Sequence, residues 1–170
     1  EYDVRIIDEC EFEKHGTKVT FHPDPDIFEE TVYDYDTLKQ RLRETAFLTK
    51  GLRIVLNDAR EEETRTHEFH YAGGIKEFVT YLNKSKEALY PDVIYCEGSK
   101  DNVYVEVAMQ HNDSYNDATY SFVNNIITPE GGTHLAGFRN ALTKTFNSYA
   151  RANKILKEND APLTGDDIRE

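Results

Sequence analysis

Residues 130–157, EGGTHLAGFRNALTKTFNSYARANKILK, form the most informative segment of this sequence. The pair Gly131-Gly132 leads directly into a run that contains no Asp or Glu and carries cations at regular intervals. Successive residues of a helix are rotated by about 100°, and on this basis the sequence predicts a helix from His134 onward with one apolar face. The cations are assigned to the opposite half of the helix surface. One face is therefore expected to pack and the other to carry charge. The cations are Arg139, Lys144, Arg151, Lys154 and Lys157.

The basic helix has two interpretations at this stage. It is either a solvated helix face with a chance excess of positive charge, or a surface that contacts a phosphate backbone. The formal net charge of −12 argues against nucleic acid as a partner for the chain as a whole. However, residues 1–36 contribute −9 of this charge, and residues 37–170 contribute only −3. Local charged patches, and not the net charge of the whole chain, therefore determine which partners residues 37–170 can bind.

The composition is that of an ordinary globular chain. With 170 residues, 38% hydrophobic content and 31% charged residues, it is long enough for one well-cored domain. The sequence contains neither an apolar run of membrane-spanning length nor a secretory signal, so we expect a cytoplasmic protein without a membrane partner. Cys10 and Cys96 are too few and too far apart to indicate a disulfide framework or a zinc site.

Alternating and helical patterns divide the chain into predicted elements. Pro23 and Pro25 interrupt any strand ladder, so two short strands precede them and a new unit follows. Asp36 is expected to cap the first helix and Gly51 to end it. Thr164, three residues before Asp167, predicts a capping box that starts a final helix. The predicted strands are 2–7, 17–21, 52–58, 64–71, 93–97, 103–110 and 119–127, and the predicted helices are 37–50, 75–84 and the long one from residue 134.

This order of elements predicts an α+β fold in which helices pack on a face of one sheet. Few residues offer self-contained chemistry. His67 and His70 are three apart in a predicted strand and point to opposite faces, so they are not expected to share a metal ion. The pairs Gly73-Gly74 and Gly131-Gly132 match no nucleotide fingerprint and are expected to be tight turns with positive φ. We therefore predict no catalytic residue and no metal site in this sequence.

Longer phrases of the sequence, in this order, resemble one known family. The resemblance is to the B subunits of bacterial type IIA topoisomerases and covers essentially every residue from Gly16 onward. GIKEFVTYLNKSK is more similar to the DNA gyrase B family than to its sister, the B subunit of topoisomerase IV. The matching phrases are GTKVTFHPDPDIF, YDYDTLKQRLRETAFLTKGLRIVLNDAR, FHYAGGIKEFVTYLNKSK, VEVAMQHNDSY, YSFVNNIITPEGGTHLAGFRNALT and LTGDDIRE.

The resemblance implies a domain organisation. Residues 1–34 would be the last strands of a GHKL ATP-binding domain, and residues 35–170 a transducer domain with the ribosomal protein S5 domain 2-like fold. Thr17 would help to bind adenine. The family's catalytic glutamate, magnesium-binding asparagine and ATP lid have no counterpart in this sequence, and neither does the loop whose lysine reaches the γ-phosphate. ATP and Mg²⁺ would serve the parent protein, while this segment alone is expected to bind no cofactor and to lack activity.

The resemblance also implies partners and a mechanism. The family is an ATP-dependent type II DNA topoisomerase whose B subunit dimerises on ATP, works with the gyrase A subunit, and passes one DNA duplex through another to introduce negative supercoils. Arg139, Lys144 and Arg151 would contact the backbone of the transported duplex. Two alternatives remain, the transducer of a topoisomerase IV B subunit and a non-catalytic DNA-binding module of the same fold.

Overall fold

The computed structural model describes Glu9 and residues 15–169, and the chain divides into two units, Glu1–Asp34 and Tyr35–Glu170. In the first unit, residues 15–34 form no strand, so the strand predicted at 17–21 is wrong. A strand is stable only against a partner, and the neighbour predicted at 2–7 lies outside the described residues. A turn begins at Asp24, whose carbonyl accepts hydrogen bonds from the amides of Ile27 and Phe28.

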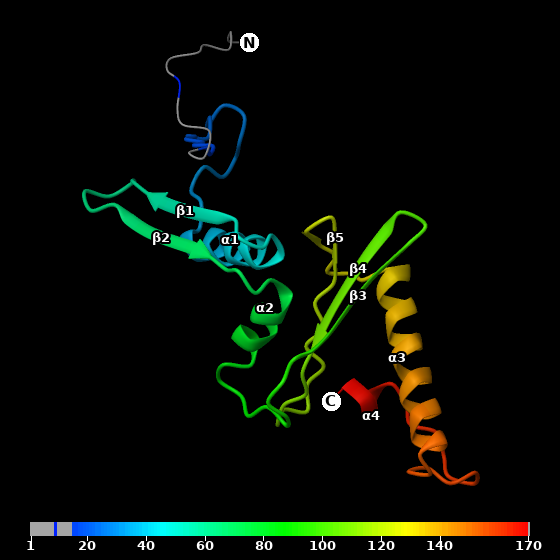
Figure 1. Cartoon of the computed structure of the whole chain (residues 1–170). Helices are drawn as coiled ribbons and strands as arrows, with labels where there is room; N and C mark the ends of the chain where they lie inside the picture. Colours follow the sequence, from blue (N-terminus) through cyan, green and yellow to red (C-terminus); the bar gives the residue numbers. More distant parts are fainter. Residues whose placement is uncertain (1–8, 10–14, 170) are drawn as a thin grey trace. The chain divides into compact units, whose positions relative to one another are not determined.

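The second unit is a mixed α/β arrangement of four helices and three hairpins among its described residues (Figure 1). Antiparallel pairing joins β1 to β2, β3 to β4 and β5 to β6, and no ladder links one hairpin to another in the described chain. The predicted single sheet is therefore wrong, because alternation reveals strands but not their partners. The elements are α1 Tyr35–Leu48, β1 Arg53–Asp58, β2 Arg65–His70, α2 Ile75–Leu82, β3 Ile94–Lys100, β4 Val103–Met109, β5 Phe122–Val123, β6 Ile126–Ile127, α3 Thr133–Ala152 and α4 Asp166–Arg169.

Two of the hairpins close through adjacent residues in the left-handed region. Asp101 and Asn102 have φ of 50° and 63° and join β3 to β4. Asn124 and Asn125 have φ of 50° and 64° and join β5 to β6. Asn and Asp tolerate this conformation, which two-residue hairpin turns require. The single strand predicted at 119–127 is therefore wrong, because its two asparagines reverse the chain.

The first two helices lie close to their predicted positions. α1 starts at Tyr35, so Asp36 lies in the first helical turn instead of capping the helix from outside. There its carboxylate still interacts favourably with the positive end of the helix dipole. Gly51, with φ of 78°, follows α1 and donates its amide to the carbonyl of Tyr71, which ties the end of the helix to the residue after β2.

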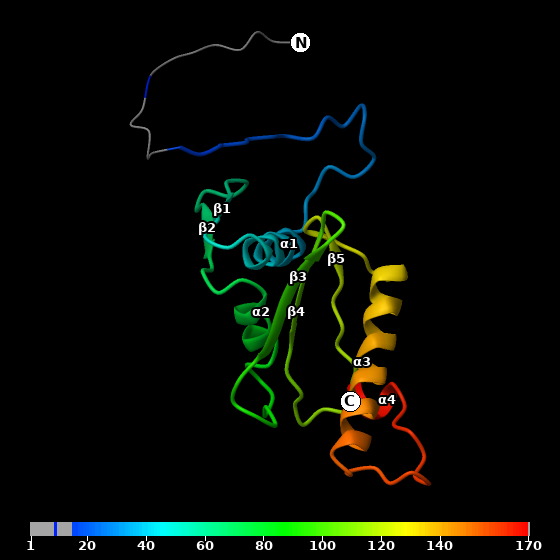
Figure 2. The same cartoon turned by 45° about the vertical axis from the view of Figure 1, so that its right-hand side comes forward.

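The main core lies where α1 packs against β1, β2 and α2. Phe47 is 1% exposed and stacks on Tyr71, with ring centroids 3.6 Å apart. Its ring centroid also lies 5.1 Å from that of Phe78 and 5.5 Å from that of Tyr81. Phe69 of β2 is buried as well. α3 runs beside the β3–β4 hairpin in both views (Figures 1 and 2). The core thus joins α1, β1, β2 and α2, whereas the buried residue of α3 is Ala150.

Candidate nucleic-acid interface

α3 begins at a turn that only glycine adopts readily. Gly131 and Gly132 have φ of 72° and 144°, and the Gly131 amide donates to the carbonyl of Thr128 at 2.9 Å. Gly132 is the N-cap, and its carbonyl accepts the first helical hydrogen bond from Ala136. The prediction of a tight turn with positive φ is confirmed for this pair and for Gly74 at the start of α2, but it is wrong for Gly73, whose φ is not positive.

The C-terminal end of α3 comes earlier than the sequence predicts. Lys154 has φ of 59°, and its amide donates to the carbonyl of Arg151, while the amide of Ile155 reaches the carbonyl of Ala150 at 2.8 Å. This pair of bonds is the Schellman motif, in which one left-handed residue closes a helix. Lys154 and Lys157 therefore lie beyond the helix, and their prediction as part of its basic face is wrong.

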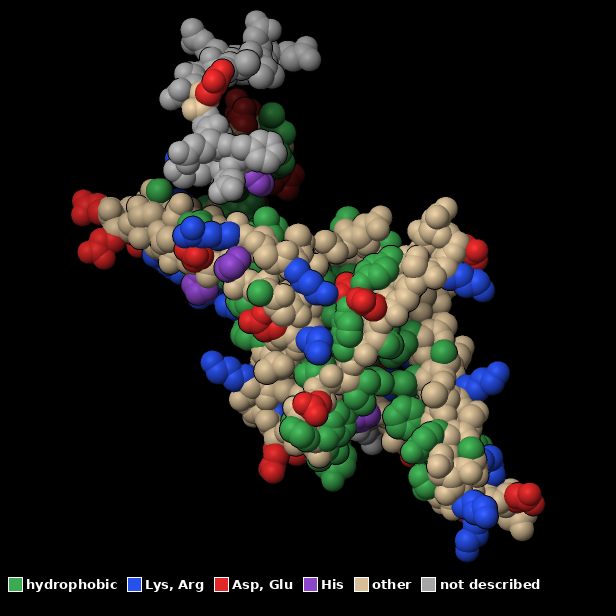
Figure 3. All heavy atoms as spheres, viewed as in Figure 1, with side chains coloured by type: hydrophobic (Ala, Val, Ile, Leu, Met, Phe, Trp, Pro, Cys, Tyr) green, Lys and Arg blue, Asp and Glu red, His purple; other side chains and the backbone are tan. Residues whose placement is uncertain are grey.

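The three remaining cations do not form one stripe. Arg139 lies about 140° around the helix from Lys144, at 3.6 residues per turn. Arg139 is half-buried beside the apolar face, whereas Lys144 and Arg151 are exposed. The assignment of Arg139 to the half opposite the apolar face is therefore wrong. Figure 3 shows basic side chains along the outer edge of the element that Figure 1 labels α3.

Arg139 and Arg169 share one carboxylate. The Oδ2 atom of Asp117 lies 3.1 Å from Nη2 of Arg139 and 2.9 Å from Nε of Arg169. Burial raises the pKa of Asp117, but hydrogen bonds from Thr119 and Arg169 and the charge of Arg139 outweigh it and hold the pKa below its usual value. Asp117 is therefore ionised at neutral pH. The sequence does not single out Asp117 and Arg169, because the residues that meet here are 22 and 52 positions apart along the chain.

Arg151 has a structural contact as well as a charge. Its Nη1 donates to the carbonyl of Lys157 at 2.9 Å, and its Nη2 donates to the carbonyl of Asp160 at 3.2 Å. The planar guanidinium thus holds the loop that follows the helix. Lys144, in contrast, makes no hydrogen bond or ion pair within residues 15–169. Lys144 is the cation of α3 most free to meet an anion.

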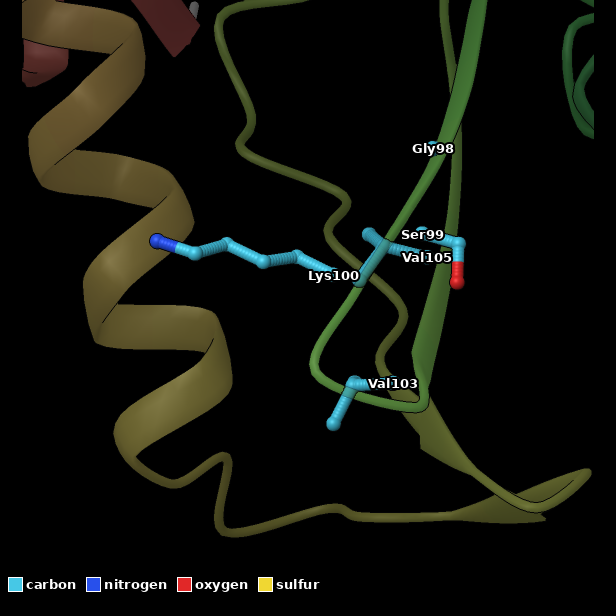
Figure 4. A pocket seen from close by; sticks show the side chains of 5 residues that line it. All are labelled: Gly98, Ser99, Lys100, Val103 and Val105. Atoms are coloured by element: carbon cyan, nitrogen blue, oxygen red, sulfur yellow. The ribbon is translucent and has the colours of Figure 1, made fainter.

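A shallow cavity of about 340 Å³ lies at the end of the β3–β4 hairpin. Gly98, Ser99, Lys100, Val103 and Val105 line it (Figure 4). Lys100 points toward the side on which α3 lies, so the hairpin adds a cation that the sequence did not single out. No carboxylate, histidine or cysteine is among its lining residues, so Ser99 and Lys100 have no general base beside them in this cavity.

The structure also places the histidines of β2 and Thr17. His67 and His70 occupy alternate faces of β2, and no group of three or more His, Cys, Asp or Glu side chains in the described part of the chain is placed to hold a metal ion. Thr17 is exposed and lies in the irregular segment of the first unit. Among the described helices, none combines the length and apolar character needed to cross a bilayer. Among the described residues, the exposed cations of α3 offer positive charge to an anionic partner.

Comparisons with known proteins point to one family. A family model described as DNA gyrase B matches residues 74–170. The B subunit of DNA gyrase from Clostridium acetobutylicum is 58% identical over 159 residues, covering 93% of this chain and 25% of that protein. The B subunit of DNA topoisomerase 4 from Enterococcus faecalis is 50% identical over 157 residues, covering 92% of this chain and 23% of that protein. The chain thus spans about a quarter of the length of these curated relatives.

Solved structures give the same result. The 43K ATPase domain of Thermus thermophilus gyrase B, solved in complex with an aminocoumarin, superimposes with a TM-score of 0.70 at 34% identity. That match covers 86% of this chain and 40% of the other chain. The B-subunit of the DNA gyrase from Myxococcus xanthus superimposes with a TM-score of 0.67 at 27% identity, covering 76% of this chain and 36% of the other.

Proposed function

The chain belongs to the DNA gyrase B family, and from this premise we propose that residues 35–170 act as the transducer of a gyrase B subunit. In this role the segment couples ATP binding and hydrolysis elsewhere in the protein to closure of a DNA gate and to passage of a duplex. The observation that carries the proposal is α3, a 20-residue helix with exposed cations and no acidic residue in a chain of net charge −12.

We further propose a domain identity for each unit. Residues 1–34 would complete a GHKL nucleotide-binding domain, and residues 35–170 would adopt the ribosomal protein S5 domain 2-like fold. The division of the chain between Asp34 and Tyr35 and the likeness to a gyrase B ATPase domain support this proposal. The described residues do not by themselves fit a complete ATP or Mg²⁺ site. Thr17 would contribute one exposed hydroxyl to a nucleotide held mainly by other parts of the complete protein.

Contacts from α3 to the transported duplex would be few and non-specific. Lys144 and Arg151 project from the exposed side of the helix, and Arg139 lies at the edge of its apolar face. Each phosphate contact adds affinity that depends on salt but carries no base sequence. A duplex that must be released after each cycle favours a small number of such contacts on an otherwise acidic protein.

A supercoiling assay tests the proposed activity. The complete protein would be combined with its A-type partner, relaxed closed-circular DNA and ATP, and the products resolved on an agarose gel. Negative supercoiling that requires ATP supports gyrase, whereas relaxation or decatenation without supercoiling assigns the chain to topoisomerase IV. The 50% identity to a topoisomerase 4 protein makes this the second candidate.

Substitution of Arg139 tests the DNA contact itself. We expect Arg139→Ala in the complete protein to lower DNA stimulation of ATP hydrolysis while nucleotide binding without DNA stays intact. Equal stimulation of the variant and the parent would refute the contact. Tight, strongly salt-dependent binding of DNA without any ATPase response would instead support a non-catalytic DNA-binding module of the same fold.

A further inference from the structure

The carboxylate of Asp117 stands between two cations from different helices. Arg139 of α3 and Arg169 of α4 both bond the same oxygen, Oδ2, at 3.1 and 2.9 Å. The other oxygen, Oδ1, accepts a hydrogen bond from the hydroxyl of Thr119. Arg169 also pairs with Asp166 at 2.9 Å, but that carboxylate is 82% exposed and its charge is screened by water. One ionised carboxylate therefore compensates two guanidinium groups only in part.

The two arginines are not held equally. The Arg169 side chain is 18% exposed and bonds two carboxylates. The Arg139 side chain is 38% exposed, and its Nε is the one buried side-chain nitrogen or oxygen without a hydrogen bond in the described part of the chain. An unsatisfied buried donor is unfavourable. Arg139 is thus the looser partner and the one more easily drawn to an external anion.

The segment that carries Asp117 also holds α4 at a second point. Nε2 of His111 lies 2.7 Å from the backbone carbonyl of Ile168, which can only accept, so the proton of this bond lies on the ring. On the other side of the ring, Nδ1 meets the hydroxyl of Tyr90 at 2.7 Å. Residues 111–117 therefore fix α4 through its backbone and through Arg169. Docking of α4 and pairing of Arg139 are linked through this short segment.

We propose that Asp117 is a charge-sharing latch that sets how strongly Arg139 engages DNA according to whether α4 is docked. This inference rests on the proposed DNA contact by α3. With α4 docked, Arg169 takes part of the carboxylate's charge and leaves Arg139 available to a phosphate. With α4 displaced, Asp117 pairs with Arg139 alone and masks it. A displacement of α4 would thereby change the affinity of α3 for the duplex.

The latch is tested by DNA binding of the complete protein. Fluorescence anisotropy of a short labelled duplex at low salt would compare the parent with Asp117→Asn, Arg169→Gln and Arg139→Gln. We expect Asp117→Asn to tighten binding and Arg169→Gln to weaken it, each by about two- to fivefold, the range of one partly exposed ion pair. Arg139→Gln should weaken binding and remove the gain from Asp117→Asn.

Two controls separate the latch from general charge effects. Glu130→Gln removes an exposed acid just before α3 and should tighten binding less than Asp117→Asn. Arg169→Gln should lose most of its effect on DNA binding when combined with Asp117→Asn, because residue 117 then has no carboxylate that could pair with Arg139. Thermal unfolding of each variant checks folding, and Asp117→Ser provides a second substitution if Asp117→Asn does not fold.

The possible failures are distinguishable. If Arg139→Gln leaves DNA binding unchanged, the proposed contact itself is wrong. If Arg139→Gln weakens binding, but Asp117→Asn and Arg169→Gln shift it in the same direction, the latch is wrong and the contact stands. An equal effect of Arg169→Gln with and without Asp117 would also overturn the latch.

Discussion

Arg151 should affect both DNA binding and the loop after α3, and these two roles can be separated. Its guanidinium donates to the carbonyls of Lys157 and Asp160 at 2.9 and 3.2 Å, and reaches the carbonyl of Glu158 at 3.5 Å. Only the first two have good hydrogen-bond lengths. Two bonds of this kind at the surface contribute about 1–2 kcal/mol together. Arg151→Ala should therefore raise the population of the open loop about 5- to 30-fold.

The matched variants are Arg151→Lys and Lys144→Ala. Lysine keeps the positive charge but lacks the planar fork that spans both carbonyls. We therefore expect Arg151→Lys to open the loop while leaving DNA binding nearly unchanged. Lys144→Ala should weaken DNA binding and leave the loop closed, because Lys144 is exposed and does not hold the loop. Its loss should reduce the slope of log affinity against log salt by about 0.9, the contribution of one phosphate.

Hydrogen exchange and DNA titration supply the two measurements. In the complete protein, exchange of amides in residues 155–161 reports the loop, and anisotropy at several salt concentrations reports the phosphate contacts. Unchanged exchange in Arg151→Lys would show that the carbonyl bonds do not hold the loop. An unchanged salt slope in Lys144→Ala would show that Lys144 meets no phosphate.

Three further predictions concern the framework of the second unit. Phe47→Ala should lower the free energy of unfolding by about 3–5 kcal/mol, because it removes a fully buried ring that stacks on Tyr71. Native-state hydrogen exchange of α1 in the complete protein measures this loss. A loss below about 1 kcal/mol would contradict the assigned core. Gly74→Ala should lower the stability of α2 by about 1–3 kcal/mol, because φ is 63° and the new Cβ would lie 2.3 Å from Cε of Lys50. Hydrogen exchange of α2 measures this change, and an unaffected α2 would refute the predicted strain. The hydrogen bond from Arg60 holds the pKa of Asp58 at about 2, below the ordinary 3.8, so the contribution of this pair to folding stability is complete above pH 3.8 and is lost as the pH falls toward 2. In Arg60→Ala, the midpoint of the Asp58 carboxyl titration, followed by NMR, should rise toward 3.8. An unmoved midpoint would exclude Arg60 as the cause.

Several elements were predictable because they depend on neighbouring residues. The hairpin of β1 with β2, the helix after Gly74 and the turn at Gly131-Gly132 all follow from periodicity or from glycine's freedom at positive φ. The capping box was also confirmed, since the Thr164 amide donates to Asp167 at 2.7 Å. Some errors arose because strand pairing is not a local property, as in the predicted single sheet. Another arose where a residue has two local possibilities. Lys154 in a left-handed conformation ends α3, although lysine is an ordinary helix residue.

The sequence alone identified the family and predicted most local elements, because a matching phrase, a helical period and a cap each depend on residues close together in the chain. Only the tertiary structure shows which charges meet. Asp117 is separated from Arg139 by 22 residues and from Arg169 by 52 residues. Nothing in local pattern selects these partners among the 20 basic and 32 acidic residues of the chain. The packing of α3, α4 and residues 111–117 brings them together, and ion pairing acts only over such short distances in water.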